Sequence, residues 1–255
     1  KAQNPVVLQF WEKIASKVGG EQSLENFVPY ITSKIDPLTA NDYMRPIIGQ
    51  QHSSFNFREI MDSKKILLVN LSKGRLGEIN SNLIGMIIVG KILMAALSRV
   101  NDVTKSFPPF YLYIDEFQNV TTDSISSILS EARKYKLGLT IAHQFIAQID
   151  EGIRDAVFGN VGSIAAFRVG TEDAEFLAKQ FEPVFTASDI SNIENRNAYV
   201  KLLSNGSPTT PFSIHTMKTH DLDMEYAQQM IEFSTLKYGT PRDVVDAAIK
   251  ARYLA

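Results

Sequence analysis

Two adjacent acids, Asp115 and Glu116, follow the apolar run Phe110–Ile114. Such a run is typical of a buried parallel strand, and two carboxylates at its carboxyl end must face a crevice, because burying them unpaired costs too much free energy. Ligands of open α/β sheets bind at that edge. An acidic pair there suits nucleotide hydrolysis, in which the first carboxylate would hold Mg²⁺ or its water shell and the second would polarise the attacking water. The alternative is a strand end whose acids cap the next turn.

Two further residues fit the same chemistry. Gln144 follows the next apolar run, Leu139–Ala142, and is expected beside Asp115 if the two strands are neighbours. A glutamine there can hydrogen-bond a γ-phosphate or align a water, and the alternative is simple exposure to solvent. Arg133 lies in the last turn of the intervening helix, expected over Asp123–Lys136, about 90° from the centre of its apolar stripe. It is therefore free to stabilise transition-state charge in a neighbouring subunit, or it complements the C-terminus of its own helix.

One segment imitates a phosphate-binding loop. Gly85–Ile92 matches the spacing Gly-x4-Gly-Lys, but Ile92 stands where a Ser or Thr must bind Mg²⁺. Its four intervening residues are bulky and apolar, whereas a phosphate cradle needs exposed backbone N–H groups. We interpret the segment as the inside of a core helix, so a nucleotide site on Asp115 and Glu116 would lack its phosphate loop within this sequence.

The elements that must position these residues alternate between strands and helices from residue 55 onward. Strands are expected at 66–69, 110–114, 139–142 and 163–169, and helices at 82–97, 123–136, 153–158 and 172–181. This alternation favours an α/β fold with a mainly parallel sheet. Asn205-Gly206 predicts a β-hairpin over residues 198–217, and helices within 221–253 close the chain. Residues 1–54 are expected to form a separate helical segment, and residues 55–255 the main domain.

The composition narrows the classes of protein. Of the 255 residues, 44% are apolar and 21% are charged, which is ordinary for a globular protein and excludes a disordered chain. The formal charge of −2 argues against non-specific binding of nucleic acid, so contacts with DNA would be weak and come from loops, with Lys73, Arg75 and residues 134–136 as candidates. The absence of cysteine excludes disulfides and thiolate zinc sites.

The ends of the chain and its most apolar stretch lead to two expectations. Leu83–Leu97 is shorter than the roughly 18 apolar residues of a membrane span, so we expect a core helix and no span in this chain. The N-terminus carries neither an initiator Met nor a signal sequence, so we expect a piece of a longer protein.

Three segments together resemble the TraG/TraD-like conjugative coupling proteins of type IV secretion systems, which are ring-forming ATPases of the wider HerA/FtsK group. They are Tyr111–Asn119, Ser130–Tyr135 and Ala142–Gln144. The resemblance covers residues 45–217 and implies the C-terminal portion of a RecA-like P-loop NTPase core. Residues 1–54 would then be the tail of an all-α domain inserted into the motor.

The resemblance also implies roles for single residues. Asp115 and Glu116 would be the Walker B pair, with Asp115 as the Mg²⁺ ligand, and Gln144 would be the glutamine on the following strand. Arg133 would be the arginine finger that acts in a neighbouring subunit. Arg168 would be a further basic residue that contacts the nucleotide, and the alternative is an ion pair with Glu172 or Asp173 at the start of the next helix.

The implied function is a hexameric motor that couples hydrolysis of ATP, with Mg²⁺, to translocation of DNA or a protein–DNA substrate. Relaxosome and secretion channel proteins would be its partners, and the cytoplasmic face of the inner membrane its location. The family's phosphate-binding loop and membrane anchor lie upstream of the inserted domain, so this chain alone is expected to hydrolyse ATP poorly or not at all. Two alternatives stay open: a non-catalytic docking module that uses residues 198–255, and a chromosomal HerA/FtsK-like DNA translocase.

Overall fold

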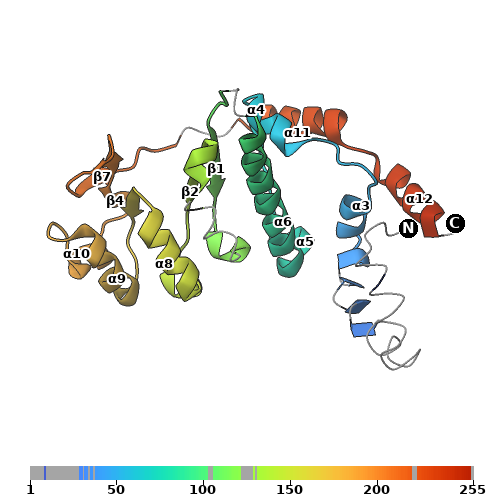
Figure 1. Cartoon of the computed structure of the whole chain (residues 1–255). Helices are drawn as coiled ribbons and strands as arrows, with labels where there is room; N and C mark the ends of the chain where they lie inside the picture. Colours follow the sequence, from blue (N-terminus) through green and yellow to red (C-terminus); the bar gives the residue numbers. More distant parts are fainter. Residues whose placement is uncertain are drawn as a thin grey trace. The chain divides into compact units, whose positions relative to one another are not determined.

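The computed structural model describes residues 38–102, 106–121, 131–219 and 223–253, together with single positions at 9, 29, 30, 32, 33, 35, 36 and 129. The chain forms two compact units (Figure 1). The first comprises Lys1–Ser54, Ser72–Asn80 and Tyr238–Ala255, and the second comprises Phe55–Leu71 and Ser81–Lys237. Most of the predicted helical segment before residue 38 lies outside the described residues, and the predicted division into domains at residue 54 stays a prediction.

The first unit is helical. The elements described in it include α3 (Met44–Ile48), α5 (Lys73–Leu76) and α12 (Arg242–Tyr253). Helix α12 lies against α3, where Arg252 donates a hydrogen bond to the carbonyl of Gly49. Met44, Val245 and Ile249 are buried, so apolar packing holds this pair of helices together.

A parallel pair of strands stands at the centre of the second unit. Strand β1 (Phe110–Ile114) pairs with β2 (Leu137–Ile141), in a register that places Ile114 opposite Ile141. Helices α6 (Glu78–Leu97) and α8 (Glu151–Asn160) contribute apolar residues to the same core as the two strands. A parallel pair needs a crossover connection, so the α/β class predicted from the sequence is confirmed.

A second sheet follows in the chain and is antiparallel. Its order is β3–β4–β7, formed by Ile164–Ala166, Asn197–Lys201 and Phe212–His215. Helices α9 (Thr171–Phe181) and α10 (Ala187–Ser191) form the core on which it packs. The predicted hairpin is confirmed: Asn205 and Gly206, with φ of 51° and 82°, form the turn between β5 (Leu203–Ser204) and β6 (Ser207–Pro208). Positive φ at both positions is the reason that this dipeptide favours hairpins.

The parallel part of the sheet is smaller than predicted. Residues 66–69 form no strand, and the side chains of Ile66 and Leu68 are 88% and 89% exposed. Strand β3 pairs antiparallel with β4 instead of joining the parallel pair. An apolar run becomes a buried strand only when neighbouring strands cover it, and none of the described residues pairs with 66–69.

Helix α6 is longer than predicted. Together with η2 (Ser98–Asn101) it is long and apolar enough to cross a membrane by length and composition alone, over Glu78–Val100 with a mean hydropathy of 2.0. Core helices of soluble proteins meet the same criteria, and Val89, Ile92 and Ala96 of α6 are buried in the core. The Gly-x4-Gly-Lys segment lies inside this helix, so its backbone N–H groups are used in helical hydrogen bonds.

The remaining elements are short helices and one exposed helix. They are α4 (Phe57–Asp62), η3 (Phe117–Val120), η4 (Ala132–Tyr135), η5 (Ile146–Gln148) and α11 (Met224–Tyr238). Most of the helix predicted over Asp123–Lys136 lies outside the described residues, and its last turn is the 3₁₀ helix η4.

Candidate functional site

The site lies where β1 and β2 end. The parallel ladder continues past the strands, since the N–H of Ala142 donates to the carbonyl of Ile114 at 2.9 Å. The N–H of Phe117 in turn donates to the carbonyl of Ala142, also at 2.9 Å. These two bonds hold the acidic pair after β1 against the segment that carries His143 and Gln144. The sequence placed Gln144 beside the acids on the condition that the two strands are neighbours, and the structure shows that they are.

The carboxylate of Glu116 accepts hydrogen bonds from two side-chain amides. Gln144 donates from Nε2 to Oε1 of Glu116 at 2.5 Å, and Gln118 donates from Nε2 to Oε2 at 2.7 Å. Gln144 was expected beside Asp115, and it instead contacts the second acid. Each carboxylate oxygen keeps one lone pair after these bonds, so Glu116 can still accept a hydrogen bond from a water.

The backbone of Glu116 is left-handed, with φ of 50° and ψ of 47°. For a residue other than glycine this conformation costs about 1–2 kcal/mol. The left-handed conformation of Glu116 turns the chain sharply between β1 and η3. Helix η3 starts at the next residue, Phe117, whose side chain is fully buried. Strain of this kind is concentrated at functional sites, where the surrounding structure holds it in place.

Asp115 is exposed and has one committed oxygen. Its Oδ1 accepts the N–H of Glu116 at 3.0 Å, which leaves Oδ2 available. The described residues hold no group of three or more His, Cys, Asp or Glu side chains able to bind a metal. Mg²⁺ at phosphate sites is usually held by one or two carboxylates, with phosphate oxygens and water as the other ligands. Asp115 therefore fits a Mg²⁺ ion that arrives with a nucleotide.

His143 and Asp173 also belong to this edge, and neither was predicted as a site residue from the sequence. The carboxylate of Asp173 is buried and accepts the N–H of Ile146 at 3.1 Å. Partial burial lowers the pKa of His143, while the negative charges of Asp173 and Glu116 oppose that shift. No local pattern could have found them, because Asp173 lies 30 residues away on α9. The histidine therefore stays neutral to lower pH than usual, in the midst of two acids.

Gln118 adds an unpaired acceptor to the site. Its Oε1 is buried and has no hydrogen-bond partner among the described residues. Buried acceptors are rarely left without a partner, so this atom points to a donor that is outside the described protein atoms, such as an ordered water.

Arg133 makes no hydrogen bond or ion pair with Asp115 or Glu116 among the described residues. Arg133 is exposed on η4, and no hydrogen bond or ion pair of its side chain is found within the described part of the chain. Its side chain is therefore available to a neighbouring subunit, which the proposed finger role requires. Many surface arginines are available in the same way.

Arg168 lies just after β3 and is also exposed. Its Nη2 donates to Oδ1 of Asn195 at 2.9 Å. The ion pair with Glu172 or Asp173 that the sequence suggested as an alternative is not formed, because Asp173 is turned toward the N–H of Ile146. A contact of Arg168 with nucleotide stays a prediction.

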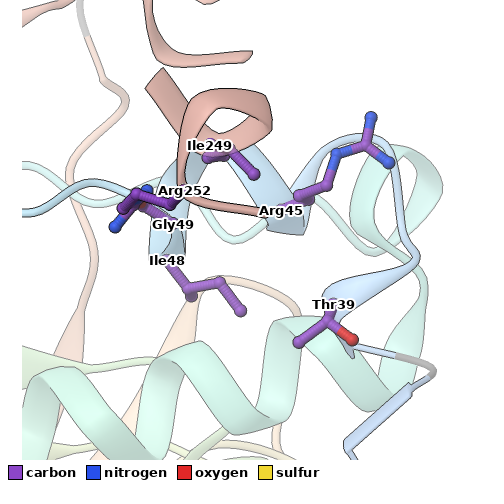
Figure 2. A pocket seen from close by; sticks show the side chains of 6 residues that line it. All are labelled: Thr39, Arg45, Ile48, Gly49, Ile249 and Arg252. Carbon is purple, nitrogen blue, oxygen red and sulfur yellow. The ribbon is translucent and has the colours of Figure 1, made fainter. Parts of the chain in front are cut away.

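A hollow in the first unit has a different character. It has a volume of about 320 Å³ and is lined by residues of α3, α12 and their surroundings, namely Thr39, Arg45, Ile48, Gly49, Ile249 and Arg252 (Figure 2). Figure 2 shows the guanidinium of Arg45 directed away from Ile48 and Thr39. Arg45 pairs with Asp42 at 3.0 Å, and Arg252 bonds to the carbonyl of Gly49. Both arginines are committed to the protein itself, so the hollow offers no free cation to a ligand.

Comparison with known proteins bears on the second unit. Residues 109–192 match the family described as the TraM recognition site of TraD and TraG. The resemblance to TraG/TraD-like coupling proteins is confirmed over these residues. They make up about a third of the chain and include all the predicted site residues, Asp115, Glu116, Arg133, Gln144 and Arg168. None of the curated proteins matches the chain significantly.

Similar solved structures include two forms of the bacterial conjugative coupling protein TrwBdeltaN70. The unbound monoclinic form is 13% identical with a TM-score of 0.46, over 67% of this chain and 41% of that one. The trigonal form in complex with sulphate is 14% identical with a TM-score of 0.48, over 67% and 45%. The genome packaging NTPase B204 of Sulfolobus turreted icosahedral virus 2, in complex with AMPPCP, is 13% identical with a TM-score of 0.44, over 66% and 74%.

These likenesses are distant, and the scores are too low to support conclusions about function. The chain spans less than half the length of the coupling protein structures that it matches.

Proposed function

We propose that this chain is the C-terminal portion of a ring-forming ATPase that couples ATP hydrolysis to translocation of DNA, or of a protein–DNA substrate, in conjugation. The observation that carries the proposal is the meeting of Asp115, Glu116 and Gln144 at one edge of the parallel pair. Ligand sites of α/β proteins lie at the carboxyl ends of parallel strands. The family match over residues 109–192 supports the same conclusion independently.

Each residue of this edge has a distinct task in the proposed reaction. Glu116, fixed by two amide donors, orients the attacking water and accepts its proton. Asp115 would hold Mg²⁺, which would neutralise charge on the phosphates. Gln144 holds the Glu116 carboxylate in place. Arg133 is donated by the neighbouring subunit to the transition state.

The partners follow from the proposed family. We propose that the intact protein is a hexamer at the cytoplasmic face of the inner membrane and that it contacts relaxosome and secretion channel proteins. DNA contacts would be weak and come from loops, since the formal charge is only −2. The matched family is described by recognition of TraM, which also favours a second candidate function, a docking surface for a relaxosome protein without catalysis in this chain.

Substitution of the second acid tests the motor against the docking module. In the intact protein, Glu116→Gln should keep nucleotide binding and lower ATP turnover by about 10²-fold or more, because the general base is lost while the side chain keeps its size. Binding is measured by calorimetry and turnover by phosphate release. Glu175→Gln, a change of an exposed glutamate on α9, is the matched control and should leave both unchanged. Full turnover in Glu116→Gln would remove Glu116 from its role. Absence of ATP turnover in the intact wild-type protein would favour the docking module.

A further inference from the structure

A buried arginine lies in the short helix that follows α6. The residue is Arg99 of η2, and only 4% of its surface is exposed. A buried guanidinium is unfavourable unless it is paired and hydrogen-bonded. Arg99 meets this requirement on two sides, and the two partners belong to different parts of the second unit.

The first partner is a carboxylate of α4. Arg99 donates from Nε and Nη2 to Oδ1 of Asp62, at 3.1 Å and 2.9 Å. The other oxygen of Asp62 accepts from Nε of Arg58, which also donates to Ser98 and Asp102 at 2.6 Å and 3.3 Å. Asp62 thus divides its two oxygens between two arginines and fixes the Arg99 guanidinium in one orientation.

The same two arginines also make cation–π contacts with one aromatic ring. The guanidinium carbons of Arg58 and Arg99 lie 4.7 Å and 5.2 Å from the centroid of the Phe107 ring. Phe107 comes three residues before β1, so the network ties α4 and the end of α6 to the entry of the central strand. Contacts of this kind add attraction on the ring face while they exclude water.

The second partner is the backbone of η4. Nη1 of Arg99 donates to the carbonyl of Tyr135 at 2.7 Å, across 36 positions of sequence. Tyr135 is the last residue of η4, and Arg133 stands two residues before it. The carbonyl of Arg133 is itself taken by the N–H of Lys136 at 3.2 Å.

The residues that flank Arg133 in this turn are buried in the core, whereas Arg133 is exposed. Ala132 and Leu137, on either side, are 5% and 4% exposed, whereas the side chain of Arg133 is open to solvent. The Arg99 hydrogen bond therefore acts on the backbone of a rigid turn from which one cation projects.

We propose that Arg99 is a positioning residue for Arg133: through the carbonyl of Tyr135 it sets the angle at which Arg133 leaves the subunit. The proposal rests on the proposed function, in which Arg133 acts in the neighbouring site. Lysine cannot replace Arg99, because one ammonium cannot reproduce the planar fork that reaches Asp62 and Tyr135 together. A displacement of about 1 Å at a reacting group costs on the order of 10²-fold in rate.

Two matched substitutions in the intact protein test the proposal. Arg99→Lys should lower kcat by about 10–10²-fold with the KM for ATP unchanged within about twofold, because nucleotide binding does not use Arg133. Arg58→Lys weakens the same network but leaves the bond from Arg99 to Tyr135, so kcat should stay near that of the wild type. Melting temperatures of both variants are measured alongside, since a purely structural role would move stability alone.

A double-substitution cycle gives the decisive comparison. On an Arg133→Ala background, Arg99→Lys should cause no further loss of kcat, because the group that it positions is gone. An equal further loss on that background, or an unchanged kcat in Arg99→Lys alone, would overturn the positioning role and leave the proposed function intact. If Arg133→Ala itself leaves turnover unchanged, the finger role is wrong and the positioning role is wrong with it. Should Arg99→Lys be insoluble, Asp62→Asn replaces it with the same expectations, since it removes the charge that orients Arg99.

Discussion

At the scale of single residues, the edge after β1 and β2 combines strain with dense hydrogen bonding. Glu116 adopts a left-handed backbone and receives hydrogen bonds from Gln118 and Gln144. Burial lowers the pKa of His143, and the negative charges of Asp173 and Glu116 act on it in the opposite direction. A neutral histidine in this place keeps the edge net negative, which suits a site for a divalent cation.

The lowered pKa of His143 predicts how stability depends on pH. The unfolded chain binds a proton on this histidine at about pH 6.5, whereas the folded chain binds it only at lower pH. Between these two values the unfolded state holds more protons, so the free energy of unfolding should fall as the pH drops below about 6.5. Thermal unfolding of the wild type and of His143→Gln, followed over this range, checks the expectation. The variant should lose less stability on acidification, and identical slopes would show that His143 does not contribute.

At the scale of elements, helix α4 illustrates how a local signal supports a distant network. Asn56 caps it, with Oδ1 accepting the N–H groups of Arg58 and Glu59 at 2.8 Å and 3.2 Å. The same helix presents Arg58 and Asp62 to the buried network around Arg99. The cap therefore stabilises the helix that holds the positioning arginine.

Removal of this cap has an expected cost. Asn56→Ala should lower the free energy of unfolding by about 1 kcal/mol, because two backbone donors lose their acceptor. Asn56→Asp keeps an acceptor at the same place and should stay close to the wild type. Denaturant unfolding of the two variants measures the difference, and equal midpoints would show that solvent replaces the cap without cost.

At the scale of the whole molecule, apolar surface is left uncovered in the second unit. Tyr111 and Tyr113 of β1 are 64% and 72% exposed, and Ile66 and Leu68 are more exposed still. Parallel sheets are normally covered on both faces. This uncovered surface supports the proposal that the chain is one portion of a larger motor.

Assembly of that motor into a ring leads to a prediction about mixed subunits. If Arg133 acts on the neighbouring site, Arg133→Ala subunits of the intact protein should inactivate wild-type neighbours, so activity should fall more steeply than the fraction of variant added. Lys179→Ala, a change of an exposed cation on α9, is the control and should leave activity unchanged. ATP turnover of rings mixed at graded ratios measures both. A decline in simple proportion would favour the alternative in which Arg133 only complements the end of its own helix.

The sequence by itself determined the features that are encoded locally. The apolar run followed by two acids predicted β1 and its edge, the following run predicted β2, and Asn205-Gly206 predicted the hairpin turn, because strand patterns and turn residues are properties of a few neighbouring positions. Only the tertiary structure decided that residues 66–69 stay unpaired and that β3 turns antiparallel. It alone revealed the interactions between distant residues, which are the hydrogen bond of Glu116 with Gln144, the effect of the Asp173 charge on His143, and the hydrogen bonds of Arg99 with Asp62 and Tyr135. These pairings depend on how separate elements pack, and no periodicity along the chain carries that information.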